Sequence, residues 1–352
     1  MRFELGIYTF GEATYDPEMG RAPTPAERLQ RLIEEAEVAD EAGLSIYAVG
    51  EHHRPEYVVS TPSVVLAALA ARTRKIRLSS AVVVLGSADP IRVFQEFATV
   101  DLLSNGRAEL MVGRGSFTES FPLFGYDLSD YDELFEEKLE LLLKIREEEI
   151  VFWPGGRFTH PIPNLGVYPR SLQRPLPVWL AVGGTPGSME RAAKLGLPVS
   201  LAIIGGSASR FKPLVDMYKQ RSMAYGNQAR LGIAAHGFIA RSRREAQALA
   251  FPAHKLTMDR IGRERGWPPF TWERFLHECR LDGALFVGEP AEIVDKILYQ
   301  HSLFRHERLI IQLTVGTIPH KAVLEAIELL GTEVLPAVEK ALDSCCPLPA
   351  SV

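Results

Sequence analysis

Several classes of protein are disfavoured by what this 352-residue sequence lacks. It has only three cysteines, Cys279, Cys345 and Cys346, too few for a disulfide framework and typical of a reducing compartment. No apolar run reaches the roughly 18 to 20 residues that a membrane helix requires. The first residues, "MRFELGIYTFGE", lack the charged and then apolar segments of a signal peptide. We therefore expect a cytoplasmic protein that does not contact membranes.

Basic clusters and metal-ligand spacings are also missing. The net charge is −5 and is spread along the chain, which predicts no nucleic-acid partner. The acidic run "DELFEEKLELLLKIREEE" carries apolar residues at helical spacing and indicates the solvated face of a helix. Nine histidines make a metal-dependent barrel hydrolase conceivable, but "HECRL" and "HERLI" both lack the second histidine of HExxH. We predict no metal site.

Short apolar runs alternate with stretches of helical period. Most runs are apolar throughout, as in a parallel sheet that helices cover on both faces. Helix starts are marked by a capping box at Thr24 and Glu27, by Asp89 before Pro90, and by Ser242 before Glu245. The predicted strands span residues 3–10, 45–50, 75–85, 107–113, 177–183, 198–204, 231–240 and 308–316.

About eight strand–helix repeats favour an α/β fold of the (β/α)8 TIM-barrel type; an open doubly wound sheet is the alternative. We predict one barrel domain over residues 1–342 and a C-terminal tail over 343–352. Two stretches break the spacing, at about 150–176 and 251–288. We expect both to be insertions at the C-terminal face, where ligands bind and lids form; outer loops without a function are the alternative.

Polar residues stand at three predicted strand ends, where a barrel places its active site. Glu51, His52 and His53 follow the second strand. At most one of two adjacent histidines can point into the barrel mouth. Histidine suits acid–base chemistry at neutral pH. The alternative is that these are partly buried histidines that form hydrogen bonds and have only a structural role.

The second strand end is "MVGRGSF", with Arg114 between two glycines. Its planar guanidinium suits a phosphate or carboxylate; a surface ion pair is the alternative. The third runs through Gly183 and Gly184 into a helix start with Thr185 and Ser188. Free N–H groups at such a start bind phosphate, although any helix start favours similar caps. Arg114 on a neighbouring strand would let one phosphate be held from two sides.

Taken together, these strand ends resemble the bacterial luciferase-like monooxygenases, a flavin-dependent TIM-barrel superfamily. The likeness rests on "MRFELGIYTFGE", "EHH", "SSAVVVLGSADPIRVFQEFATVDLLSNGRAELMVGRGSF", "FGYD" and "GGTPGSMERAAKLGLP". It is weak over residues 205–300.

The resemblance implies that His52 is the catalytic acid or base near the flavin and that Arg114 grips the FMN phosphate. It also implies a cis peptide bond between Ala81 and Val82 against the flavin. His53 is expected to pack and form hydrogen bonds, with Glu51 or a water orienting His52. The predicted cofactor-binding residues are Ala81, Val82, Arg114, Ser116, Gly183, Gly184, Thr185 and Ser188.

The implied function is a monooxygenase that takes reduced FMN from a separate, transiently bound flavin reductase. It would activate oxygen as a flavin hydroperoxide and oxidise a small organic substrate such as an aldehyde or ketone. We expect a homodimer by analogy. Phe117, Trp153 and Trp267 are predicted apolar walls of the site. Gly113 stands where the light-emitting luciferase subunit has cysteine, which argues against a light-emitting role.

Two alternatives stay open within the superfamily. One is a hydride-transferring oxidoreductase that uses a deazaflavin. The other is a flavin-binding subunit without catalysis, against which the presence of His52 and Arg114 argues.

Overall fold

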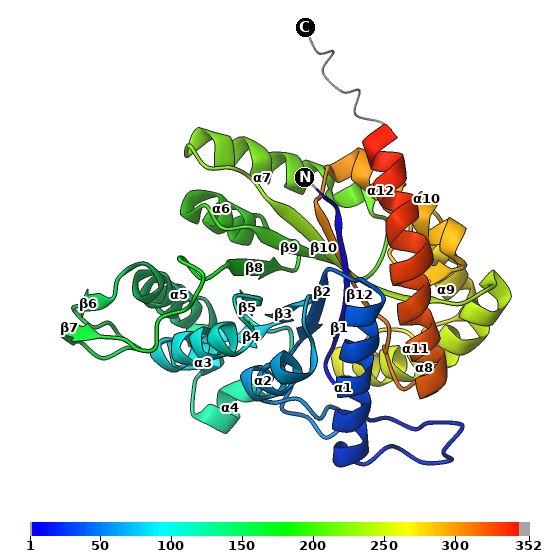
Figure 1. Cartoon of the computed structure of the whole chain (residues 1–352), viewed down its shortest axis with the longest axis horizontal. Coiled ribbons are helices and arrows are strands. Elements are labelled where there is room, and N and C mark those ends of the chain that lie inside the picture. Colours follow the sequence, from blue (N-terminus) through cyan, green and yellow to red (C-terminus); the bar gives the residue numbers. More distant parts are fainter. Residues whose placement is uncertain (1, 345–352) are drawn as a thin grey trace, which may run out of the picture.

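The computed structural model describes residues 2–344, and its centre is a closed barrel of parallel strands (Figure 1). Each of the eight barrel strands pairs with the next one along the chain, and the last, β12, pairs with the first, β1, which closes the barrel. The barrel strands are β1 Glu4–Thr9, β2 Ile46–Val49, β3 Arg77–Ser80, β5 Ala108–Gly113, β8 Val178–Val182, β9 Val199–Ile203, β10 Leu231–Ile239 and β12 Arg308–Gln312. The predicted TIM barrel is confirmed.

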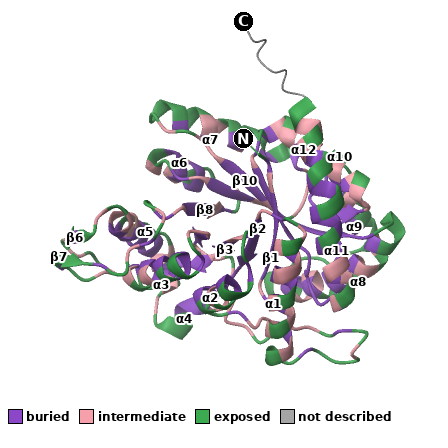
Figure 2. Cartoon of the chain, in the orientation of Figure 1, coloured by how far each residue is buried: buried purple, intermediate pink, exposed green. Residues whose placement is uncertain are grey.

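Helices surround this barrel, and buried residues line the strands and the inward helix faces (Figure 2). Within residues 2–344, no helix is long and apolar enough to cross a membrane. The helices are α1 Pro25–Glu41, α2 Pro62–Arg72, α3 Pro90–Leu103, α4 Ser120–Phe124, α5 Tyr131–Glu147, α6 Pro186–Leu195, α7 Lys212–Ala224, α8 Arg243–Arg265, α9 Trp272–Cys279, α10 Pro290–Phe304, α11 His320–Leu329 and α12 Leu335–Ser344, with short helical turns η1 Leu85–Ser87, η2 Leu128–Asp130, η3 Ser209–Phe211 and η4 Leu330–Val334.

The predicted helix starts are confirmed in their details. Thr24 and Glu27 form the reciprocal capping box of α1. The Asp89 side chain accepts a hydrogen bond from the Arg92 N–H, and Ser242 accepts one from Glu245. These caps determine the residues at which α1, α3 and α8 begin after the loops that follow their strands.

The two predicted insertions leave the barrel at different ends. Residues 150–176 contain the hairpin of β6 Ile150–Trp153 and β7 Ile162–Gly166. They follow α5 and precede β8, and Gln173 donates to the Ala108 carbonyl at the start of β5 (2.7 Å). Helix-to-strand connections return the chain to the N-terminal end, where this insertion has its base. The hairpin then runs back along α5, and Arg157 at its tip pairs with Asp130 and Glu133 at the start of α5 (both 2.8 Å), so the expected position at the C-terminal face is confirmed for the tip alone. Trp153 donates to Thr159 of the same hairpin (2.9 Å) and is not a wall of the mouth.

Residues 251–288 do reach the C-terminal end. They comprise most of α8, then α9 and β11 Phe286–Gly288, which pairs with β10. The last turns of α8 contact the loops that follow β2 and β5. At the C-terminus, α12 extends through Ser344, so the first two residues of the predicted tail are helical; residues 345–352, with Cys345 and Cys346, lie outside the described residues.

The barrel interior is layered along its axis. At the N-terminal end, the buried Arg308 guanidinium pairs with Glu109 (2.6 Å) and lies 4.0 Å from the centre of the Trp179 ring. Above it lies an apolar layer that includes Tyr8, Ile46, Ala48, Ala81, Met111, Trp179 and Ile310. Because these two layers fill the barrel, chemistry with outside molecules is confined to the C-terminal mouth.

Candidate functional site

The Glu51-His52-His53 segment begins where β2 ends. The Glu51 N–H donates to the Val82 carbonyl (3.3 Å) and the His52 N–H to the Val59 carbonyl (2.9 Å). The Glu51 carboxylate lies 3.3 Å from His53 Nε2, and this hydrogen bond raises the pKa of His53. Glu51 therefore orients His53, and the expectation that it orients His52 is wrong. His53 forms hydrogen bonds as predicted.

His52 pairs with a carboxylate from a different loop. Its Nδ1 lies 3.2 Å from Oε1 of Glu119, which follows β5. The imidazole is enclosed by Phe10, Tyr57 and Phe117, whose ring centres lie 4.4, 4.6 and 4.8 Å from its own. The ring is thus fixed both by packing and by one ionisable partner. Phe117, a predicted wall residue, thus contacts the His52 ring.

The peptide bond between Ala81 and Val82 is cis, as the resemblance implied. It lies between β3 and β4 Val83–Val84. Ala81 is buried in the apolar layer of the barrel, and Val82 packs against that layer. Because the Glu51 N–H donates to the Val82 carbonyl, this segment lies directly beside the histidine loop.

Arg114 extends from the end of β5 toward the first turn of α6. Its Nη2 lies 3.1 Å from Ser188 Oγ and 3.5 Å from Thr185 Oγ1. The Thr185 hydroxyl donates to Ser188 (2.8 Å) and does not cap the helix. The N–H groups of this first turn are therefore available, and guanidinium, hydroxyls and helix N-terminus form one anion-binding donor set.

The other residues predicted around the phosphate have different roles in the structure. Gly184 has φ +106°, a conformation that favours glycine. The Cβ position of Gly183 has no heavy atom within 4 Å, so a bound group can approach its backbone. Ser116 is exposed, and its carbonyl accepts a hydrogen bond from Arg265 (2.8 Å).

A carboxylate occupies the free side of the Arg114 guanidinium. Arg114 Nη1 donates to Asp132 at the start of α5, and the Asp132 side chain is 65% exposed. A phosphate bound at Arg114 would compete with this exposed ion pair, which is worth little by itself. No sequence pattern pointed to Asp132, because its approach to Arg114 depends on how α5 packs.

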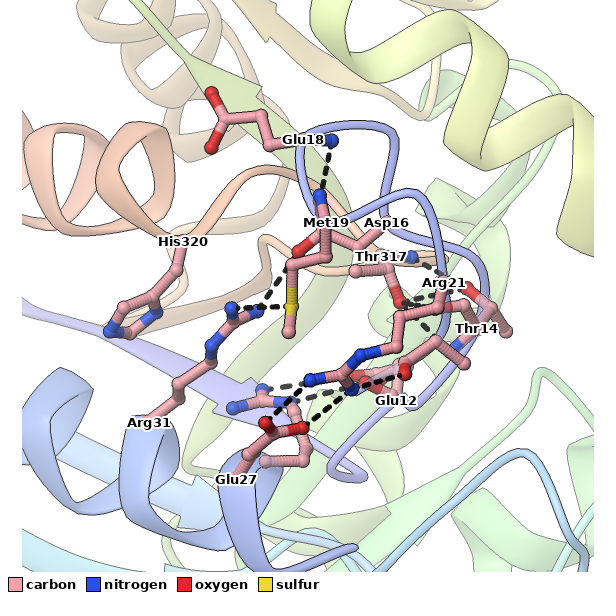
Figure 3. Close-up of polar contacts among 12 residues, drawn as sticks. Glu12, Thr14, Asp16, Glu18, Met19, Arg21, Glu27, Arg31, Thr317 and His320 are labelled. Carbon is pink, nitrogen blue, oxygen red and sulfur yellow. Dashed lines mark hydrogen bonds and ion pairs between the residues drawn. The ribbon is translucent and has the colours of Figure 1, made fainter. Parts of the chain in front are cut away.

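The loop between β1 and α1 is held rigidly at the mouth (Figure 3). Thr14 and Thr317 exchange hydrogen bonds of 2.8 to 2.9 Å, and Arg31 is directed at Asp16 and Met19. The buried Glu12 accepts hydrogen bonds from Thr9, Gln312 and Thr314. Through these hydrogen bonds, the loop after β1 is held against the end of β12 and the residues that follow it. Phe10, at the start of the same loop, contacts the His52 ring.

Helix α8 reaches from β10 to the loops that carry His52 and Arg114. Arg54 pairs with Glu264 (2.9 Å) and Arg260 with Glu56 (3.2 Å). Arg54 and Arg265 both lie about 5 Å from the Phe117 ring centre. The predicted wall residue Trp267 lies just beyond α8, 48% exposed. The end of α8 therefore covers the ring that shields His52.

Comparisons with known proteins show the family of this chain. The model of the luciferase-like monooxygenase family matches residues 3–307, and the chain belongs to this family. It is 27% identical to uncharacterized protein y4vJ of Sinorhizobium fredii over 92% of this chain and 96% of that protein. It is 29% identical to the alkanal monooxygenase alpha chain of the Kryptophanaron alfredi symbiont, over 57% of this chain and 56% of that one.

Solved structures show the same fold. Monooxygenase RslO1 of Streptomyces bottropensis superposes with a TM-score of 0.80 at 23% identity, over 95% of this chain and 99% of that one. The oxygenating constituent of 3,6-diketocamphane monooxygenase of Pseudomonas putida, in complex with FMN, gives 0.75 at 17%, covering 96% and 99%. The coenzyme F420-dependent tetrahydromethanopterin reductase of Methanopyrus kandleri gives 0.71 at 18%, covering 96% and 99%. Similar folds thus include both FMN-binding and F420-dependent proteins.

Proposed function

We propose that this protein is an FMN-dependent monooxygenase that uses reduced FMN and O2 to oxidise a small organic substrate such as an aldehyde or ketone. One observation carries the proposal: a single loop, residues 114–119, begins at the anion-binding donors and ends at the partner of His52. A phosphate-tailed flavin would be gripped at one end of this loop and would meet an acid–base group at the other.

The donor chemistry fits a flavin phosphate. Arg114 offers a charged planar fork, and Thr185, Ser188 and the start of α6 add neutral donors, a set suited to a phosphate dianion. When bound, the flavin would supply the electrons and the oxygen chemistry. The chain's own residues would orient it, exclude water through Phe117 and the end of α8, and move a proton at His52. Ala81 and Val82 would lie against the flavin.

The proposal implies a partner and an assembly. A separate flavin reductase would deliver reduced FMN in a transient encounter. We further propose a cytoplasmic homodimer, by analogy with barrels of this family. Size-exclusion chromatography with light scattering tests the dimer, and oxygen consumption that starts only when a reductase and a nicotinamide donor are added tests the two-component scheme.

The first test is binding of FMN, followed by quenching of flavin fluorescence, with the reduced form titrated anaerobically. Arg114→Ala should weaken binding about tenfold or more, because a hydrogen bond to a charged group contributes about 1.5 to 3 kcal/mol. Arg72→Ala is a control, since Arg72 is in the last turn of α2 and pairs with Glu37 of α1, outside the donor set. Failure of both redox forms to bind would refute the proposal.

A second candidate is a deazaflavin-dependent hydride transfer, which the similarity to an F420-dependent reductase favours. Parallel titrations with FMN and F420, and oxygen uptake after reduction, separate the two. A non-catalytic flavin-binding subunit is the third candidate. It predicts that His52→Ala binds flavin normally and that neither protein supports turnover.

A further inference from the structure

The pairing of His52 with Glu119 determines which imidazole nitrogen is free. The Glu119 carboxylate is partly buried, which by itself would raise its pKa, but the hydrogen bonds from His52 and from backbone N–H groups outweigh burial and lower the pKa of Glu119. Glu119 is therefore an ionised acceptor with no proton to donate. The hydrogen between the two groups must then be on His52 Nδ1, at 3.2 Å from Oε1.

The other ring nitrogen of His52 has no partner in the part of the chain that the structure describes and is not fully buried. Within residues 2–344, His52 Nε2 makes no hydrogen bond, and it is not among the buried polar atoms without a partner. The rings of Phe10, Tyr57 and Phe117 hold the imidazole plane. Burial raises the pKa of Tyr57 to about 12, so that this neighbour stays a neutral phenol. Nε2 therefore presents a lone pair to any molecule bound there.

Among the residues that the structure describes, no other carboxylate bonds to His52. Glu51 is bonded to His53 Nε2 at 3.3 Å. Glu119 also accepts from the His53 N–H at 3.4 Å, so it joins the loop after β2 to the loop after β5. The cations around the rings that enclose His52 have other partners. Arg54 pairs with Glu56 and Glu264, and Arg260 pairs with Glu56. Arg265 lies over Phe117, as Arg54 does, and donates to the Ser116 carbonyl.

We propose that Glu119 is a positioning residue that holds His52 as the Nδ1–H tautomer, which leaves Nε2 as the atom that takes up and returns a proton during turnover. The part of this inference that concerns turnover rests on the proposed function, whereas the part that concerns the tautomer of His52 does not. A proton moves from the bound reactant to Nε2, and the resulting imidazolium keeps its Nδ1–H bond to the carboxylate. The same proton then returns to the product or leaves to water. Glu119 itself does not change protonation state.

The tautomer can be measured without flavin or substrate. Imidazole 15N shifts of the labelled protein, assigned with His52→Ala, report which nitrogen carries hydrogen at a pH where His52 is neutral. We expect a protonated Nδ1 and a free Nε2 in the wild type and in Glu119→Gln, whose amide oxygen can still accept. Glu119→Ala should shift the population toward the Nε2–H form.

Glu51→Gln is the matched control, because it changes the carboxylate that bonds to His53 and leaves the contact between Glu119 and His52 unchanged. It should move the His53 signals only. A wild-type His52 with hydrogen on Nε2, or a tautomer unchanged in Glu119→Ala, would overturn the proposal. So would a His52 tautomer that responds to Glu51→Gln and not to Glu119→Ala.

The role in turnover has a separate readout. Glu119→Gln should lower kcat by about tenfold or more, within the range that acid–base catalysis contributes, and leave the Kd for FMN unchanged. Equal kcat in Glu119→Gln and wild type would overturn the catalytic part of the inference. If no flavin binds at all, the proposed function fails, while the tautomer result still decides whether Glu119 positions His52.

Discussion

A buried histidine far from the mouth provides a quantitative test of this structure. His306 lies between α10 and β12, at the N-terminal end of the barrel, and is 1% exposed. Its ring packs edge-on against Phe3, with centres 5.4 Å apart. Neither ring nitrogen has a hydrogen-bond partner among residues 2–344. Burial lowers the pKa of His306 from 6.5 to about 3.

The sign and size of the effect follow from proton linkage. As the pH falls below 6.5, the unfolded chain binds a proton that folded His306 refuses, so the free energy of unfolding decreases. Each pH unit between the two pKa values removes about 1.4 kcal/mol. The contribution of neutral His306 to the free energy of unfolding is thus complete above pH 6.5. Between pH 7.5 and 4.5 the free energy of unfolding falls by about 3 kcal/mol because of this residue.

His306→Met removes the titratable group and keeps an apolar side chain in its place. Urea denaturation followed by tryptophan fluorescence should show that the variant loses about 3 kcal/mol less than the wild type between these pH values. Gln300→Met is the control, since Gln300 is also fully buried with an unpaired amide but has no proton to bind. An equal pH dependence in His306→Met and wild type would refute the reasoning.

Two further changes test the site and the barrel interior. Asp132→Asn should tighten FMN binding by about 1.4-fold to fivefold, because it removes an exposed ion pair worth about 0.2 to 1 kcal/mol that competes for Arg114; weaker binding in a flavin titration would contradict this. Glu109→Gln should lower the free energy of unfolding by about 3 to 5 kcal/mol, since it leaves the buried Arg308 charge poorly compensated. Glu4→Gln, whose carboxylate is 25% exposed on the same guanidinium, should lose less in parallel denaturant melts.

Local sequence determined most of the barrel. Seven of the eight predicted strands are confirmed to within a few residues, because parallel strands buried on both faces read as continuous apolar runs. The strand predicted over 75–85 is two strands, β3 and β4, separated by the cis bond between Ala81 and Val82. Thr24, Asp89 and Ser242 mark helix starts through hydrogen bonds that span only three residues. Arg114, Thr185 and Ser188 were predicted to cooperate, since adjacent parallel strands end at one edge, and the structure brings them together.

Only the tertiary structure decided the partners of these residues. Nothing in the spacing of Glu119 and His52, 67 positions apart, predicts their contact. The hairpin at 150–176 begins and ends between a helix and a strand, and only its packing along α5 brings its tip to Asp130 and Glu133 at the start of that helix. Helix caps and strands depend on neighbouring residues, so the sequence determined them. That His52 pairs with Glu119 and not with Glu51 depends on how closure of the barrel aligns the loops after β2 and β5.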